Sequence, residues 1–196
     1  MAGGPGPNST LGIPGGRRTR ATRVLNSSGP GPNAQSVPEA AVRDLLRATD
    51  LLGEVPVPVV RIAAALRIRV VETAFTESGL AGLIVVDAAE RTIYVSRSDP
   101  PARQRFTIAH ELGHFWMHMR SGDVRGFKDF GPQLAFRSDN NLTALEREAN
   151  AFAAELLMPR AQVRQLARQG LLADDVQRYF EVSHEAASIR LQQTTR

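Results

Sequence analysis

The five residues His110-Glu111-Leu112-Gly113-His114 constrain the fold of this chain more than any other feature of its sequence. In an α-helix each residue advances by about 100°, so His110 and His114 lie roughly 40° apart, one turn from each other on one face. Two imidazoles in this arrangement can bind one metal ion, and Glu111, about 100° from His110, can reach a water molecule on that ion. The pattern therefore predicts a helix that carries a metal site on one face.

The residues around this pattern divide into two faces, as expected for a helix that covers a core. Residues 98–101 (Ser-Asp-Pro-Pro) are typical of a helix start, with Asp99 as the expected cap, and the helix is predicted to run through Arg120. The face opposite the histidines is mainly apolar and comprises Arg105, Ile108, Leu112, Trp116 and Met119. This division indicates a functional face rather than a chance pair of surface histidines.

The chain contains no cysteine, so a metal ion has to be held by His, Asp or Glu. A third protein ligand is expected, because a catalytic zinc ion usually takes three and keeps one position for water. His118 lies a further turn, about 6 Å, beyond His114, which is hard to reconcile with an ion held between the two histidines. The metzincin extension is excluded, because Met117 and Arg120 stand where that subclass needs Gly and His.

A second predicted helix, residues 143–158, offers Glu146, Glu148 and Glu155 as the missing ligand. Its apolar residues lie on one arc, which includes Glu146 and leaves the other two glutamates outside (Leu142, Leu145, Ala149, Phe152, Ala153, Leu156 and Leu157). A carboxylate turned toward a core requires a partner, and a bound cation would be one. Glu146 is therefore the predicted ligand, and Asn150, one turn later, is predicted to orient a ligand.

The other segments predict an α+β domain. Apolar residues recur at helical spacing in two segments between 38 and 66, and three β-branched runs follow at 68–71, 83–86 and 93–95. The connection 87–91 suits a hairpin, so we expect a small antiparallel sheet. Within the helical segment 160–193, residues 174–191 are similar to a helix-turn-helix. DNA binding is not expected, because the second half of this motif offers only Arg190 and His184 as cations.

The first 37 residues differ in composition from the rest of the chain. They hold 8 of the 16 glycines, 5 of the 12 prolines, four arginines and no acidic residue. Such a segment buries too little apolar surface to offset its ordering entropy, so we expect a disordered tail over 1–37. Residues 38–196 would form one domain, with 160–196 as a helical cap within it. This domain is neutral, with 20 basic and 20 acidic residues, so the formal charge of +4 comes from the tail and does not favour nucleic-acid binding.

Two segments carry a family resemblance. Residues 105–114 (RFTIAHELGH) and 146–159 (EREANAFAAELLMP) closely resemble the ImmA/IrrE family of metallopeptidases. Upstream, Pro58, Ile62-Ala63, the turn 79–82 and the hairpin are similar to that family as well, so the resemblance spans about residues 40–192. It implies a zincin-like fold. It also implies His110, His114 and Glu146 as metal ligands, and Glu111 as the catalytic glutamate.

The expected activity is metal-dependent hydrolysis of a peptide bond in a protein substrate. Zinc is the expected ion and manganese the alternative, since a His/His/Glu site can hold either. Glu111 would take a proton from the attacking water and deliver it to the leaving amine. The resemblance alone implies a helix-turn-helix transcriptional repressor as the substrate. Oxyanion stabilisation is left open among Tyr94, Arg103, His118, Tyr179 and His184.

Two other functions stay open on the sequence. One is a metal-dependent regulator that binds a protein partner or DNA without cleaving it, and the other is the effector or antidote of a toxin–antitoxin-like pair. We expect the protein to be cytoplasmic, because no run approaches the ~18 apolar residues of a membrane span and no secretory signal is recognisable.

Overall fold

The computed structural model describes residues 36–76, 80–86, 91–120 and 140–194. Residues 1–35 of the predicted tail, Gly79 and the hairpin connection 87–90 lie outside the described residues. The described residues all belong to one compact unit, Pro32–Arg196. The first described element of this unit is a helix that includes Ser36 and Val37, so the last two residues of the predicted tail are helical. The division into a tail, a domain and a cap stays a prediction.

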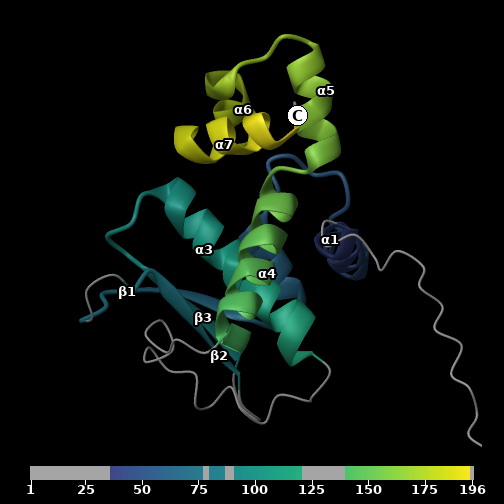
Figure 1. The fold of residues 1–196 in the computed structure, drawn as a ribbon. Helices are drawn as coiled ribbons and strands as arrows, with labels where there is room; N and C mark the ends of the chain where they lie inside the picture. Colours follow the sequence, from purple (N-terminus) through teal and green to yellow (C-terminus); the bar gives the residue numbers. More distant parts are fainter. Residues whose placement is uncertain (1–35, 77–79, 87–90, 121–139, 195–196) are drawn as a thin grey trace, which may run out of the picture. The chain divides into compact units, whose positions relative to one another are not determined.

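The described elements form a mixed α+β fold, which confirms the predicted fold class (Figure 1). Two helices precede the three strands, and the remaining helices follow them. In chain order these are α1 (Ser36–Ala48), α2 (Val59–Ala65), β1 (Arg69–Thr73), β2 (Gly82–Val86), β3 (Arg91–Ser96), α3 (Pro101–His114), the π-helix η1 (Phe115–Met119), α4 (Asn140–Leu157), α5 (Arg160–Arg168), α6 (Ala173–Phe180) and α7 (His184–Thr194).

The sheet has the order β1-β3-β2, and its strands are not all antiparallel. β2 and β3 form the predicted antiparallel pair, with Ile84 opposite Ile93. β1 pairs with β3 in parallel, with Val70 opposite Ile93, so the prediction of an antiparallel sheet was wrong for this pair. The reason is strand order: β3 lies between β1 and β2 and runs in the direction of β1. Alternation of apolar residues does not reveal this order.

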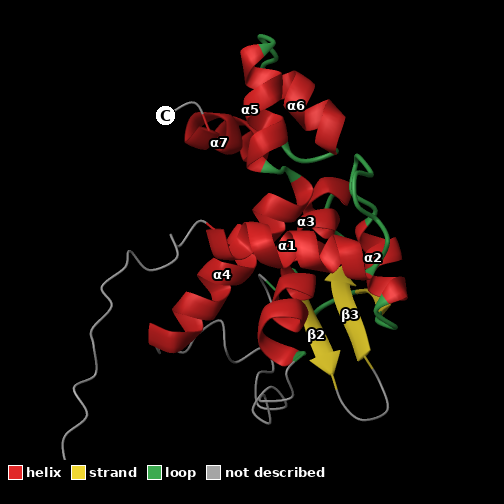
Figure 2. Ribbon diagram, turned by 90° about the vertical axis from the view of Figure 1, so that its right-hand side faces the viewer, coloured by secondary structure: helices red, strands yellow, loops and turns green. Residues whose placement is uncertain are grey.

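A contiguous hydrophobic core joins the sheet, the first two helices and the C-terminal helices. Its fully buried side chains include Leu45 in α1, Ile93 in β3, Leu112 in α3, Phe152 in α4 and Phe180 in α6. α3 and α4 share the most extensive helix contact, and α1 packs against α4 (Figure 2). This core therefore holds the helix with the two histidines against the helix with Glu146.

Both ends of α3 differ in detail from the prediction. Pro100 occupies the cap position and no side chain caps the helix, so the capping role predicted for Asp99 was wrong. Asp99 instead pairs with Arg103, with 3.2 Å between carboxylate and Nε. After His114 the helix continues as a π-helix, in which Arg120 N–H donates to Phe115 O. π-turns are rare and are often found at functional sites. Among the described residues, no helix has the length and apolar character needed to cross a membrane.

Candidate metal centre

The two histidines of α3 and Glu146 of α4 converge on one point. His110 Nε2 and His114 Nε2 lie 3.0 Å apart. Each of these nitrogens lies 3.2 Å from an oxygen of the Glu146 carboxylate. The three side chains thus form a candidate cluster for a metal ion, with all ligand atoms within 4.8 Å of one another. The structure brings together all three predicted ligands.

The donor set and its spacing fit a single divalent ion. Two ligands on a tetrahedral zinc ion, each about 2.0–2.1 Å from it, lie about 3.3 Å from each other. The distances of 3.0–3.2 Å within the cluster are close to this value. The histidines are largely buried, whereas the Glu146 side chain is 56% exposed, so the cluster lies at the surface end of the contact between α3 and α4.

Electrostatics in this cluster favour a cation. Hydrogen bonds to His110 and His114 hold the pKa of Glu146 well below its usual range, so its carboxylate is ionised at neutral pH. Burial alone would lower the pKa of His110, but Glu146 and Glu111 outweigh burial and raise it. The raised pKa of His110 reflects the carboxylates beside this imidazole, whose negative charge a bound cation would neutralise.

Asn150 lies directly behind His110, as the spacing on α4 predicts. Its Oδ1 is 3.1 Å from His110 Nδ1. An Nδ1–H that donates to this oxygen leaves Nε2 as the lone-pair nitrogen facing the cluster, and it fixes the plane of the ring. Asn150 is therefore placed to orient this histidine.

Glu111 is buried, with a relative exposure of 7%, between α3 and the sheet. Burial raises the pKa of this carboxyl, while His110 and His114 oppose that shift. The backbone N–H of Ile84 in β2 donates to the Glu111 carboxylate. Sequence reasoning missed this contact, because a backbone donor carries no side-chain signal. The contact places the edge of β2 beside the glutamate predicted to act in catalysis.

The spacing between α3 and α4 depends on Gly113, which lies between Glu111 and His114. A Cβ atom there would lie 3.0 Å from Cδ1 and 3.3 Å from Cβ of the fully buried Phe152. Such contacts are tighter than ordinary packing, so only glycine fits without movement of the neighbouring helix. The glycine within the motif thus allows the close helix approach that brings Glu146 to the histidines.

Residues 63–192, about two thirds of the chain, match the model of the M78 peptidase family, described as the IrrE N-terminal-like domain. The chain belongs to this family. The ImmA/IrrE resemblance carried by residues 105–114 and 146–159 is therefore confirmed.

Two known proteins are similar to this chain in sequence. Metallopeptidase ImmA of Bacillus subtilis (strain 168) is 27% identical over 114 residues, which are 57% of this chain and 63% of the relative. The uncharacterized immunity region protein 2 of Bacillus phage phi105 is 28% identical over 109 residues, 56% of this chain and 64% of the relative. The matches thus span less than two thirds of the length of either relative.

A solved structure shows the same fold. A Mycobacterium tuberculosis transcriptional regulator aligns with a TM-score of 0.54 over 76% of this chain and 44% of its own, at 18% sequence identity. At this identity the likeness extends to the fold alone. It supports the α+β architecture expected for the IrrE N-terminal-like family.

The burial of the glutamates on α4 differs from the prediction. The apolar arc placed Glu146 toward the core and Glu155 outside it, but Glu146 is half exposed and Glu155 has a relative exposure of 7%. Glu146 lies at the candidate ligand cluster, but the burial that the apolar arc predicted for it was wrong. Glu148 lies 3.6 Å from His118, and neither residue is part of the candidate ligand cluster His110, His114 and Glu146.

The side chains considered for oxyanion stabilisation make contacts outside the cluster. Arg103 pairs with Asp99, and His184 Nε2 lies 3.3 Å from Asp174. Tyr179 is half exposed on α6 and makes an edge-to-face contact with its neighbour Phe180. Tyr94 lies opposite Leu83, on the face of the sheet that alternates with the face of Ile84 and Ile93. His118 lies beside a predicted ligand, with a distance of 5.8 Å between its ring centroid and that of His114.

Proposed function

We propose that this member of the IrrE N-terminal-like family is a metal-dependent endopeptidase that hydrolyses a peptide bond in a protein substrate. The observation that carries the proposal is the convergence of His110, His114 and Glu146, with the buried Glu111 beside them. We propose zinc as the ion, with manganese as the alternative. When bound, zinc would polarise the scissile carbonyl and lower the pKa of a bound water to about 7.

Glu111 is the proposed general base and, later, the general acid. Its raised pKa suits a group that takes up a proton and gives it back within one catalytic cycle. The hydrogen bond from Ile84 N–H fixes one end of the carboxylate against β2. The carboxylate then delivers the proton to the amine of the departing peptide.

The free edge of β2 is the proposed binding site for the substrate backbone. Ser96 N–H donates to Ala81 O at 2.9 Å, which makes this pair a hydrogen-bonded one in the antiparallel ladder. Because such pairs alternate, Gly82 and Val86 turn their N–H and C=O groups away from β3, and so does Ile84, whose N–H already donates to Glu111. In the described sheet β2 is an edge strand, so an extended substrate segment could pair along it and pass Glu111.

The proposed substrate is a helix-turn-helix transcriptional repressor in the cytoplasm. This class is the one that the ImmA/IrrE resemblance implies. The name of the phage relative, an immunity region protein, favours the same regulatory setting. DNA binding by the chain itself has little support, because the single arginine of α7, Arg190, is buried.

The test is incubation of the purified chain with repressors encoded beside its gene, in the presence of zinc, manganese or a chelator, with cleavage measured by intact mass. Glu111→Gln should lose at least a hundredfold in cleavage rate while it keeps its fold and its metal. Glu185→Gln, at an exposed position on α7, is the matched control and should cleave normally. Cleavage by Glu111→Gln at the wild-type rate would contradict the proposal. If Glu111→Gln still derepresses the target genes, the result would support the alternative function, a metal-dependent regulator that binds a protein partner or DNA without cleaving it.

A further inference from the structure

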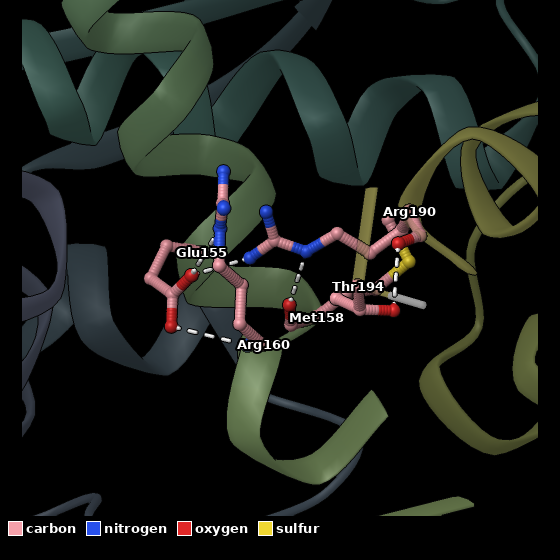
Figure 3. A network of polar contacts seen from close by, with 5 residues as sticks. All are labelled: Glu155, Met158, Arg160, Arg190 and Thr194. Atoms are coloured by element: carbon pink, nitrogen blue, oxygen red, sulfur yellow. Dashed lines mark hydrogen bonds and ion pairs between the residues drawn. The ribbon is translucent and has the colours of Figure 1, made fainter. Parts of the chain in front are cut away.

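A buried arginine joins α7 to the end of α4 (Figure 3). Arg190 has a relative exposure of 3%, and its Nε donates to Met158 O at 2.8 Å. Its Nη2 donates to the Glu155 carboxylate. The other oxygen of Glu155 accepts the backbone N–H of Arg160 at 3.2 Å. Both oxygens of the Glu155 carboxylate and the carbonyl of Met158, just past the end of α4, thus accept hydrogen bonds within one connected network.

This network fixes the direction of α4 as well as its position. The carbonyls at a helix C-terminus have no partner within the helix, and a guanidinium can donate to one of them and to a carboxylate at the same time. Thr194 Oγ1 donates to Arg190 O at 3.0 Å, which ties the arginine to the last turn of α7. The C-terminal end of α4 is thus held from the side of α7 by directional bonds.

α4 rests on α3 at the contact between Phe152 and Gly113, in the last third of α4. Glu146 precedes Phe152 by six residues and Met158 follows it by six, so both lie about 9 Å from this contact along the helix. A tilt of α4 about the contact that moves Met158 by 1 Å therefore moves Glu146 by about 1 Å. Metal–ligand distances tolerate only about 0.2 Å, so such a tilt would take Glu146 out of range.

The C-terminal helices also hold α3. Arg105, on α3, donates through Nη2 to Phe180 O at the end of α6, at 3.4 Å, and to Val57 O, at 3.1 Å. The same group of helices therefore contacts both of the helices that carry the predicted ligands. A displacement of α7 would act on α4 while α3 keeps its own attachment to α6.

We propose that Arg190 is a positioning residue for the metal centre: it fixes the C-terminal end of α4 and thereby sets the distance of Glu146 from His110 and His114. This inference rests on the proposed metal site. It assigns to α7 a role in metal binding, although no residue of α7 belongs to the ligand cluster.

The test measures zinc affinity by competition with a chromogenic chelator, well below the melting temperature, so that cleavage activity is not needed. Arg190→Lys keeps the positive charge beside Glu155 but cannot donate in the same two directions. The double variant Glu155→Leu/Arg190→Met replaces the buried pair with apolar side chains and preserves folding. The matched control is Val176→Ala, which truncates a fully buried side chain of α6 outside the network.

Both network variants should bind zinc at least fivefold more weakly than the wild type, whereas Val176→Ala should stay within twofold at a comparable loss of melting temperature. Network variants that bind zinc within twofold of the wild type would overturn the proposal, as would an equal loss in Val176→Ala. Glu146→Gln separates the two inferences. If it weakens zinc binding strongly while the network variants do not, only the positioning role fails; if it binds like the wild type, the metal site fails.

Discussion

Substitution of Gly113 by alanine tests the close contact between the two ligand-bearing helices. In an ordinary helix this change stabilises the folded state by about 1 kcal/mol, because alanine loses less backbone entropy on folding. At this position the added Cβ meets Phe152 Cδ1 at 3.0 Å and Phe152 Cγ at 3.3 Å. Phe152 is fully buried in the core, so neighbouring side chains surround it.

The expected net effect is a loss of stability. Overpacking of a core costs about 1–3 kcal/mol, so after the gain in helix propensity Gly113→Ala should destabilise the protein by about 0–2 kcal/mol. A loss of 1 kcal/mol corresponds to a decrease of about 2–4 °C in melting temperature for a domain of this size. Because the helices have to separate by a few tenths of an ångström, zinc affinity should fall as well, by about tenfold.

Thermal unfolding with and without zinc measures both effects. The double variant Gly113→Ala/Phe152→Leu provides the control, because a smaller side chain opposite the new methyl group relieves the overlap. The loss of stability in the double variant should therefore be smaller than the sum of the losses in the two single variants. A Gly113→Ala variant that is more stable than the wild type and binds zinc equally well would refute the reasoning.

Three further predictions follow from the geometry of the site and the sheet. Asn150→Ala should keep the fold but weaken zinc binding about 10- to 100-fold, because His110 loses the oxygen that orients it; unchanged affinity in a chelator competition would argue against this role. Gly82→Ala should cost about 1–3 kcal/mol in urea unfolding, since a Cβ there collides with Thr107 Cγ2 and lies 2.8 Å from the backbone oxygen of Tyr94; wild-type stability would mean that β2 can shift. Zinc at about 1,000 times its dissociation constant should stabilise the wild type by about 4 kcal/mol and Glu146→Gln far less, and an equal gain in both would contradict the ligand set.

The helix with the two histidines could be predicted from sequence because its signal is local. Residues at positions i and i+4 share a face in any α-helix, so His110 and His114 point the same way without knowledge of the rest of the fold. The π-helix at 115–119 and the parallel pairing of β1 with β3 could not be predicted in this way. Neither leaves a mark in the spacing of apolar residues.

The orientation of α4 shows why periodicity was a weaker guide there. A helical wheel assumes one buried stripe along the whole helix, but α4 packs against α3 and α1 and meets Arg190 of α7 near its C-terminal end. The buried direction therefore changes along the helix, and Glu155 is buried through a partner 35 residues further on. Glu146, on the supposedly apolar arc, lies at the exposed end of the contact with α3.

Anomalous X-ray diffraction from zinc-loaded crystals, measured at the zinc absorption edge, shows directly whether His110, His114 and Glu146 bind the ion. We expect a zinc peak about 2.0–2.2 Å from His110 Nε2, His114 Nε2 and an oxygen of Glu146. The distances between these atoms, 3.0–3.2 Å, require only small side-chain movements to reach that geometry. Zinc held by other residues, or no zinc at these three side chains, would contradict the proposed metal site.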